Sequence, residues 1–559
     1  MMTQQFAAQR RLELLRSMEE EVLDVLVIGG GITGAGILLD AQTRGMKAGL
    51  VEMQDFAAGT SSRSTKLVHG GLRYLKQFEI KMVAEVGKER EIVYENGPHV
   101  TTPEWMLLPF HKGGTFGAFS TSFGLRLYDF LAGVKRSERR KMLSKEETAH
   151  REPLLKQQGL LGGGYYVEYR TDDARLTIEV MKKAIEHGGR AVNYAMANQL
   201  HYENGRLAAV TVLDQISGQS FLLRARKIVN ATGPWVDLLR EKDQSKKGKM
   251  LRLTKGVHLV FDSSRFPLRQ AVYFDTPDGR MVFAIPREGK TYVGTTDTDY
   301  QAERATPRMT LNDRNYILEA ANYMFPELNL TAKDVESSWA GLRPLIYQEG
   351  KSPSEISRRD EVLRSESGMF TIAGGKLTGY RKMAEHVTDM LQRELEAEGA
   401  GSYRSCVTKK LPIAGGETGG SEGFERLLRE QIQAGNALGL DAATAEQLTR
   451  RYGANVPVVY SLIGEARQEA ADSKLPAEVY AALEYALRHE MATKPVDFFI
   501  RRTGALFFDI AWVRRYKDAV ITHMASRLDY TPEQLASYAA ELEQQLTEAV
   551  TPAPDSADR

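Results

Sequence analysis

Cysteine is almost absent from this chain. Cys406 is the single cysteine among 559 residues, so no disulfide can form within the chain. Neither a multi-cysteine zinc site nor an iron–sulfur cluster can be built. Since no group of His, Asp and Glu has convincing ligand spacing either, we expect no bound metal. A reducing compartment suits such a sequence.

Long apolar runs and an excess charge of one sign are also missing. No uninterrupted apolar run approaches the roughly 20 residues that a membrane span needs. The N-terminal segment MMTQQFAAQRRLELLRSMEEE is too charged for a signal peptide. Lys plus Arg number 74 and Asp plus Glu 73, a net charge of +1, which argues against a nucleic-acid binder. We expect a cytoplasmic protein, either soluble or peripheral on the inner face of the cell membrane.

Glycine marks the most informative stretch. Residues 24–36 read DVLVIGGGITGAG, an apolar β-branched run that breaks into glycines and resumes with helical spacing. Gly29, Gly31 and Gly34 hold the GxGxxG positions, which allow a tight turn, a close backbone approach to a pyrophosphate and close helix–strand packing. Glu52 ends the next strand, where an acid binds the ribose hydroxyls. This stretch predicts a dinucleotide site.

Three later segments offer small residues to the same cofactor. Residues 56–74, FAAGTSSRSTKLVHGGLRY, are dense in Gly, Ser and Thr but carry apolar anchors that a linker lacks. Residues 226–234 form a strand that ends in Ala-Thr-Gly, and residues 370–382 form a strand, a Gly-Gly turn and a helix start. So many backbone approaches imply an extended FAD rather than a diffusible NAD. The predicted cofactor contacts are Gly29, Gly31, Gly34, Glu52, Thr60, Ser61, Ser62, Leu67, Thr232, Gly233, Gly375 and Thr378.

The remaining pattern predicts an α/β protein with three domains. We expect a discontinuous Rossmann-like FAD-binding domain from residues 22–98, 165–245 and 365–400. The alternating strands of residues 246–364, together with residues 99–164, predict an antiparallel β-rich substrate domain. Residues 401–424 read as a Gly-rich linker and residues 425–549 as a C-terminal helical domain. The tail, TPAPDSADR, has the composition of a disordered segment.

An apolar and aromatic run followed by a basic cluster lies within residues 105–141. The basic part includes Arg136, Arg139, Arg140 and Lys141. Such a segment suits a monotopic membrane surface, where rings lie at headgroup depth and cations meet anionic lipid. It equally suits a domain-packing helix with a solvated basic end. A membrane surface is therefore one of two readings of this segment.

Taken together, several motifs resemble the FAD-dependent glycerol-3-phosphate dehydrogenases. They are VIGGGITGAG, TSSRSTKLVHGGLRYL, NATGPWV, GVHLVF, VGTTDTDY, GLRPL, ISRRDE and AGGKLTGYRKMAEH. The resemblance runs from about residue 24 to about residue 529 and implies a fold like that of D-amino-acid oxidase. It also implies oxidation of sn-glycerol 3-phosphate to dihydroxyacetone phosphate, with electrons passed from FAD to a membrane quinone.

The resemblance assigns roles to cations and to one histidine. A dianionic phosphate needs more than one cation, and the planar fork of Arg gives it paired hydrogen bonds. We place Arg343 and Arg358 on the substrate, and Lys376 and Arg73 near flavin and phosphate. For the base we choose His258, because imidazole titrates in a suitable range and a strand fixes its position. His69 is the rival, and residues 295–297 read as a capped turn at least as readily as a substrate contact.

Three other functions share parts of this pattern. A glycerol-3-phosphate oxidase that uses oxygen and makes hydrogen peroxide would carry the same motifs. An amino- or hydroxy-acid oxidase of the same fold would need only one Arg for its carboxylate. A non-catalytic flavin-binding module would need neither the cations nor His258. The sequence fixes neither the oligomeric state nor the role of the helical domain.

Overall fold

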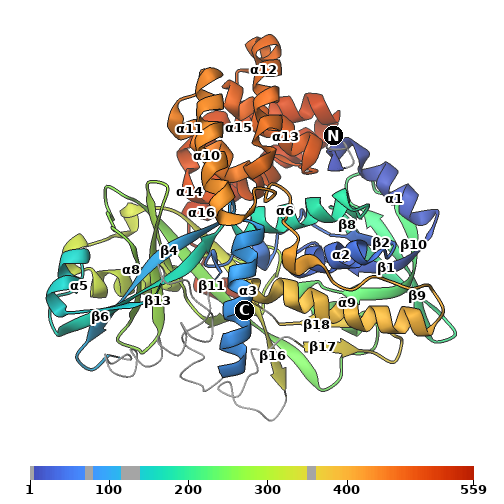
Figure 1. Cartoon of the computed structure of the whole chain (residues 1–559), viewed down its shortest axis with the longest axis horizontal. Coiled ribbons are helices and arrows are strands. Elements are labelled where there is room, and N and C mark those ends of the chain that lie inside the picture. Colours follow the sequence, from blue (N-terminus) through green and yellow to red (C-terminus); the bar gives the residue numbers. More distant parts are fainter. Residues whose placement is uncertain (1–5, 69–79, 115–138, 349–360, 375, 559) are drawn as a thin grey trace.

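The computed structural model describes residues 6–68, 80–114, 139–348, 361–374 and 376–558. Two sheets lie side by side beneath a cap of helices, as Figure 1 shows. The first sheet carries the glycine turn, the second carries the predicted catalytic strands, and the C-terminal helices lie over both. The predicted fold class, a Rossmann-like domain with a β-rich domain and a helical domain, is confirmed.

The first sheet has the strand order β17-β18-β10-β1-β2-β7, with β9 on β10 and β8 on β9. The strands from β18 to β7 run parallel, and such a sheet must be covered on both faces. Val25 and Val27 of β1 pack on the face of α2, α6 and α9, whereas Leu26 and Ile28 pack on the face of α1. The elements are α1 Arg11–Glu19, β1 Val22–Ile28, α2 Ile32–Arg44, β2 Ala48–Val51, α6 Asp173–Glu186, β7 Arg190–Val192, β8 Ala195–Glu203, β9 Arg206–Asp214, β10 Ser220–Asn230, α7 Val236–Lys242, β17 Glu361–Arg364, β18 Phe370–Ala373 and α9 Tyr380–Ala397.

The second sheet is mostly antiparallel and runs β15-β11-β14-β13-β12-β4-β6-β3, with β16 on β11 and β5 on β6. Its long β11–β16 pair sets His258 opposite Trp339 and Thr254 opposite Arg343. The elements are β3 Leu67–Val68, α3 Ile80–Asn96, β4 Thr101–His111, β5 Lys141–Leu143, α5 Lys145–Arg151, β6 Leu160–Thr171, β11 Lys249–Asp262, β12 Ala271–Asp275, β13 Met281–Arg287, β14 Lys290–Gly294, β15 Thr298–Asp299, α8 Leu311–Met324 and β16 Val335–Gln348.

Two predicted domain boundaries differ from the sheet pairings. The boundary at residue 165 falls inside β6, which pairs with β4 along its whole length and so belongs to the second sheet. The boundary at residue 364 places β17 with the substrate domain, although β17 pairs with β18 of the first sheet. Both strands have the right periodicity, but periodicity does not say which sheet a strand joins.

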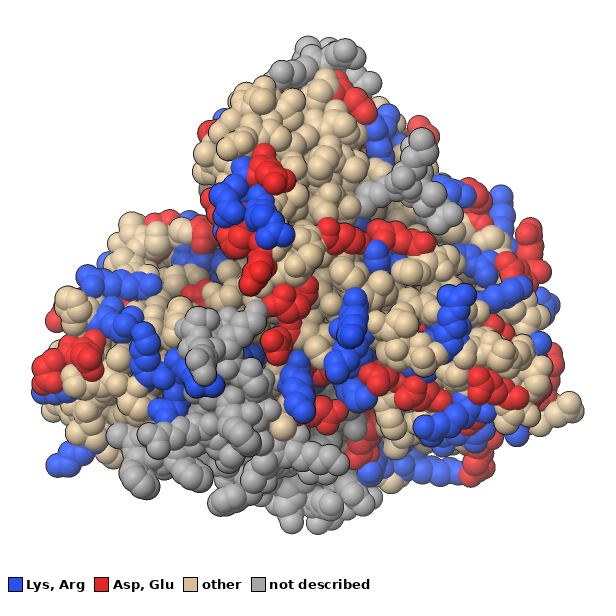
Figure 2. All heavy atoms as spheres, in the orientation of Figure 1, with Lys and Arg blue, Asp and Glu red and all other residues tan. Residues whose placement is uncertain are grey.

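The apolar segment proposed for membrane contact begins as a core strand. Met106, Leu107, Leu108 and Phe110 of β4 are at most 1% exposed and pack inside the second sheet. Residues 115–138, including Arg136, lie outside the described residues. No helix in the described part of the chain is long and apolar enough to cross a membrane. On the face seen in Figure 2, basic and acidic side chains are interspersed over the described surface.

The C-terminal helices form one domain fixed by buried charge. Asp55, which follows β2, accepts hydrogen bonds from Arg502 at 2.7 and 2.9 Å and from Asn193 at 2.9 Å, and it pairs with Arg501. These arginines end a π-helical turn, so the helical domain is held by ion pairs against the nucleotide-binding sheet. The elements are α10 Gly420–Ala437, α11 Ala442–Tyr452, α12 Val456–Ser473, α13 Ala477–His489, the π-turn Asp497–Arg502, α14 Ala505–Phe508, α15 Ile510–Leu528 and α16 Pro532–Val550.

The prediction of a disordered tail is wrong. The amide of Ala553 donates to the Met309 oxygen at 2.8 Å, and Asp558 pairs at 2.6 Å with the fully buried Lys255 of β11. Lys255 also pairs with Asp313 of α8 at 2.6 Å. A polar, Pro-containing composition predicts disorder for a segment that has no binding partner in the fold. Here the buried ammonium group of Lys255 pairs with the tail and orders it.

Candidate active site

The glycine turn between β1 and α2 has no room for side chains. Gly29 has a φ of +116°, and a Cβ on it would lie 2.4 Å from the Ala231 carbonyl oxygen. A Cβ on Gly34 would lie 1.9 Å from the Gly29 oxygen. Gly31 stands at the N-cap of α2. The backbone beside the N-terminus of α2 is therefore open to the close approach of a pyrophosphate.

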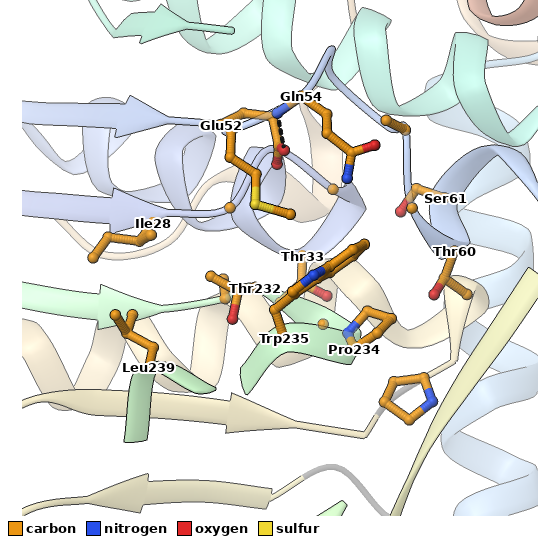
Figure 3. A pocket seen from close by; sticks show the side chains of 18 of the residues that line it. Ile28, Thr33, Glu52, Gln54, Thr60, Ser61, Thr232, Pro234, Trp235 and Leu239 are labelled. Carbon is orange, nitrogen blue, oxygen red and sulfur yellow. Dashed lines mark hydrogen bonds between the residues drawn. The ribbon is translucent and has the colours of Figure 1, made fainter. Parts of the chain in front are cut away.

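Glu52 is tied directly to that turn. Its carboxylate accepts hydrogen bonds from the amides of Gly30 at 2.6 Å and Gln54 at 2.8 Å, the second of which is drawn in Figure 3. Burial raises the pKa of Glu52, and the two amides oppose that rise. The acid at the end of β2 is thus oriented by the backbone that a dinucleotide would meet, which suits a ribose contact.

A cavity of about 340 Å³ runs from the glycine turn toward the second sheet. In Figure 3 Glu52, Thr60 and Ser61 lie on one side and Thr232, Pro234 and Trp235 on the other. The far end reaches Pro344 of β16 and Lys376. Of the predicted cofactor and catalytic residues, the lining brings together Gly29, Gly31, Glu52, Thr60, Ser61, Thr232, Gly233 and Lys376.

The other predicted residues lie elsewhere. Gly34 lies under the turn, Ser62 is buried beside Lys66, Leu67 belongs to the core strand β3, and Thr378 is buried in the 3-10 turn before α9. None of these four lines the cavity. Gly375, Arg73, Arg358 and the rival base His69 lie outside the described residues. These assignments stay predictions.

Several lining residues were not predicted from the sequence. Trp235 and Pro234 lie in the NATGPWV motif, and a large ring directly after a cofactor-approach turn is a signal that could have found them. A second group, the Ala-Met-Ala of residues 195–197, opens β8, and a third, Leu238, Leu239 and Lys242, belongs to α7. Neither the start of an ordinary strand nor a short helix carries such a signal.

His258 lies on β11, where its ring contacts Trp339 and Tyr292 beside the loop of residues 60–66. Its Nε2 is 3.1 Å from Thr65 Oγ1, and its ring stacks on Trp339 at a centroid distance of 4.7 Å. Burial, together with the charges of Arg343 and Lys66, lowers the pKa of His258 well below its usual value. The imidazole is therefore neutral at neutral pH, the form that can accept a proton.

Arg343 of β16 lies on the same face of the sheet as His258. A Cβ on Gly256 would lie 2.5 Å from Arg343 Nη2, and residues 256 and 258 of one strand point to the same side. The segment that we interpret as a capped turn holds this guanidinium. The terminal nitrogens of Arg343 donate to Thr295 Oγ1 at 3.0 Å, the Thr296 oxygen at 3.2 Å and Asp297 Oδ1 at 3.1 Å.

The loop of residues 60–66 joins the nucleotide cavity to this face. Thr60 Oγ1 donates to the Leu342 oxygen at 2.7 Å, and Trp339 Nε1 donates to the Ser64 oxygen at 3.0 Å. Tyr292 of β14 donates its hydroxyl to the oxygen of Thr65 at 3.1 Å. Through this loop, a basic side chain and a neutral imidazole are fixed near the cavity of the glycine turn. Such an arrangement suits an oxidoreductase that acts on a small anionic substrate.

Known proteins are similar to this chain over nearly its whole length. Residues 24–381 match the FAD dependent oxidoreductase family, and residues 406–535 match the C-terminal domain of alpha-glycerophosphate oxidase. The aerobic glycerol-3-phosphate dehydrogenase of Bacillus subtilis is 61% identical over 99% of this chain and 100% of its own. Its counterpart in Staphylococcus aureus strain USA300 is 56% identical over 97% of each chain. The chain belongs to the aerobic glycerol-3-phosphate dehydrogenase family.

Solved structures agree with this family. The glycerol-3-phosphate dehydrogenase of Bacillus halodurans, complexed with FAD, is 50% identical and superposes with a TM-score of 0.86 over 98% of this chain and 99% of its own. The L-alpha-glycerophosphate oxidase of Mycoplasma pneumoniae, 18% identical with a TM-score of 0.53, shares the fold over 66% of this chain and 95% of its own. The resemblance seen in the sequence is confirmed.

The residues present fit the cofactor of this family. The turn at Gly29 excludes any Cβ, Glu52 presents a carboxylate at the end of β2, and the cavity extends to Pro344 of β16. These features suit an extended FAD, and the predicted cofactor is confirmed for the family.

Proposed function

We propose that this chain oxidises sn-glycerol 3-phosphate to dihydroxyacetone phosphate with bound FAD and passes the electrons to a membrane quinone. The observation that carries the proposal is the contact between His258 and Thr65. It puts a neutral imidazole against the loop whose Thr60, Ser61 and Ser64 line the nucleotide cavity. Relatives that are 56–61% identical bear the name aerobic glycerol-3-phosphate dehydrogenase.

FAD is held at its phosphates by the turn of Gly29 and Gly31 and at its ribose by Glu52. Lys376, at the far end of the cavity, lies near the flavin, where a cation stabilises the negative charge of the reduced ring. When bound, FAD supplies the two-electron acceptor, taking the hydride from C2 of the substrate at N5.

The base is His258. Its neutral imidazole takes the proton of the C2 hydroxyl at Nε2, the ring nitrogen that lies near Thr65. Stacking on Trp339 fixes the plane of the ring, so the nitrogen needs no reorientation during the reaction. Burial, and after it neighbouring positive charge, lowers the pKa of His258, so the free site holds the imidazole in its neutral form at neutral pH.

The phosphate anchor is Arg343, joined by Arg358 and Arg73 from outside the described residues. Arg343 is about one third exposed, so it is fixed by residues 295–297 yet keeps an accessible surface. A substrate dianion would compete with Asp297 for the guanidinium, because the two carry the same sign of charge.

The absorbance of the flavin under anaerobic conditions tests which substrate the protein oxidises. The yellow FAD-bound protein should bleach anaerobically on addition of glycerol 3-phosphate and stay yellow with D-alanine or lactate. Bleaching by D-alanine or lactate would instead indicate the amino- or hydroxy-acid oxidase, and no bleaching by any of the three would indicate a non-catalytic module. In His258→Asn, flavin reduction should slow by roughly a hundredfold or more, the usual loss of a general base.

Quinone is the proposed acceptor, and the oxygen-using oxidase is the competing function. The match of residues 406–535 to a domain named for an oxidase is the observation that favours the alternative. Photoreduced protein mixed with a soluble quinone should reoxidise much faster than with oxygen. Fast reoxidation by oxygen would make the protein an oxidase.

Peripheral attachment to the inner face of the cell membrane is proposed from the basic end of the segment discussed above. Arg139 and Arg140 precede β5, which starts at Lys141. In a flotation assay, the FAD-bound protein should be recovered with vesicles that contain anionic lipid. Changing Arg139, Arg140 and Lys141 together to Glu should reduce the fraction of protein that floats with the vesicles. Equal flotation of the altered protein would remove this cluster from the proposal.

A further inference from the structure

We propose that a second cavity binds the phosphate group of a small metabolite. This cavity has a volume of about 530 Å³ and shares no lining residue with the nucleotide cavity. It lies where the three parts of the fold meet. The second sheet contributes Arg170 and Arg287, α6 contributes Arg175, and α11 contributes Arg450 and Arg451. A ligand here would tie the helical domain to both sheets.

The cavity carries more positive than negative charge. Its five arginines face three carboxylates, those of Asp172, Glu288 and Glu446. Most of the positive charge is already neutralised, because Arg175 pairs with Glu490 at 2.8 Å and also with Glu179. Arg450 pairs with Glu446 at 2.8 Å, and Arg170 pairs with Glu104 at 3.3 Å. Arg451 forms no ion pair with a carboxylate in the described part of the chain. Arg451 is therefore the lining arginine that remains available to an anion.

Arg287 is a buried donor in the wall of the cavity. It is 8% exposed, and its guanidinium stacks 4.3 Å from the ring centroid of Phe508. Its contacts with carboxylates are long, 3.3 Å to Asp172 and 3.5 Å to Glu288, whereas charge-assisted bonds are typically about 2.7–2.9 Å. Its Nη1 has no hydrogen-bond partner among the described residues. A buried guanidinium in this state is stabilised by an anion that completes its bonds.

Phosphate is the anion that these donors suit. Its tetrahedral oxygens can accept hydrogen bonds from more than one guanidinium, and the lining offers Arg287 from the sheet and Arg451 from the helical domain. The predicted catalytic face is not reached from here, because Phe508 contacts Trp339 at a centroid distance of 5.5 Å and Trp339 in turn covers His258. A ligand in this cavity is therefore not the substrate in the act of oxidation.

The test is a calorimetric titration of the FAD-bound protein with inorganic phosphate, at an ionic strength held constant with chloride. We expect saturable binding that Arg451→Gln weakens by roughly tenfold or more, the loss of one charge-assisted bond. Arg429→Gln, the matched control on the exposed side of α10, should leave binding unchanged. Arg451 is partly exposed and pairs with no carboxylate of the described residues. Its replacement should therefore not unfold the protein, and retained flavin absorbance will verify this.

Phosphate can also occupy the predicted substrate anchor, so a second variant separates the two sites. Arg343→Gln should keep the binding event that Arg451→Gln weakens. The proposal is overturned if Arg343→Gln abolishes all phosphate binding, or if Arg451→Gln binds phosphate as tightly as the unaltered protein. It is also overturned if no saturable binding occurs, since the cavity then holds only water.

Discussion

Two glycines of the second sheet make room for the two proposed catalytic side chains, and exchanging each for alanine should damage a different kinetic constant. A Cβ on Gly256 would lie 2.5 Å from Arg343 Nη2, and a Cβ on Gly294 would lie 2.2 Å from His258 Cδ2. Ordinary contacts begin near 3.4 Å, so each side chain must retreat by roughly 1 Å, a misplacement that can cost about a hundredfold in rate.

Gly256→Ala should raise the apparent dissociation constant of glycerol 3-phosphate, because it displaces the phosphate anchor. Gly294→Ala should instead lower the limiting rate of flavin reduction, because it displaces the base. Anaerobic stopped-flow reduction over a range of substrate concentrations gives both constants. Gly464→Ala is the control, since no atom lies within 4 Å of its added Cβ. If both variants alter the same constant equally, the assignment of separate anchor and base is refuted.

Three further predictions rest on buried groups. Asp55→Asn leaves two buried arginines short of a counter-charge and should lower the free energy of unfolding by about 3 kcal/mol, measured by urea unfolding; an unchanged midpoint would contradict this. Glu52→Gln should weaken FAD binding by roughly ten- to hundredfold, measured by fluorescence titration of the apoprotein, and unchanged affinity would remove Glu52 from the ribose site. Burial and the charges of Arg175 and Lys182 lower the pKa of His99 to about 3. Below about pH 6.5 the unfolded chain therefore binds a proton at His99 that the folded protein does not bind, so the free energy of unfolding falls on acidification. His99→Gln should reduce the loss between pH 7 and 5.5 by about 1 kcal/mol; an equal loss would mean that His99 is not buried in its neutral form.

The nucleotide-binding half could be predicted because its requirements are local. A strand, a turn that bars side chains and a helix must follow one another within a few residues, and Gly29, Gly34 and Glu52 reveal that order directly. The ends of β10 and β18 gave the same kind of local signal. Geometry of this short range depends on residues that are adjacent in the sequence, so a sequence pattern can reveal it.

The other features depend on long-range pairing. Nothing near Lys255 in the sequence indicates that Asp558 will reach it, and nothing in the strand of Leu160–Thr171 tells which sheet it will join. The same holds for residues 295–297, whose contact with Arg343 depends on the register of β11 against β16. Such contacts follow from the packing of distant segments rather than from local composition.

The helical domain, whose role the sequence leaves open, supports the catalytic strand from behind. Ser338 Oγ of β16 donates to the Ala549 oxygen of α16 at 2.8 Å, and Ser337 Oγ donates to the Phe507 oxygen of α14. The next residue, Trp339, packs on Phe507 on that side and stacks on His258 on the other. Its indole N–H meanwhile bonds the cofactor loop. The strand that carries Arg343 is therefore held between the helical domain and the loop of residues 60–66. This double attachment fixes the proposed base and the proposed anion anchor relative to the nucleotide cavity, whose glycine turn lies some three hundred positions earlier in the chain than Arg343.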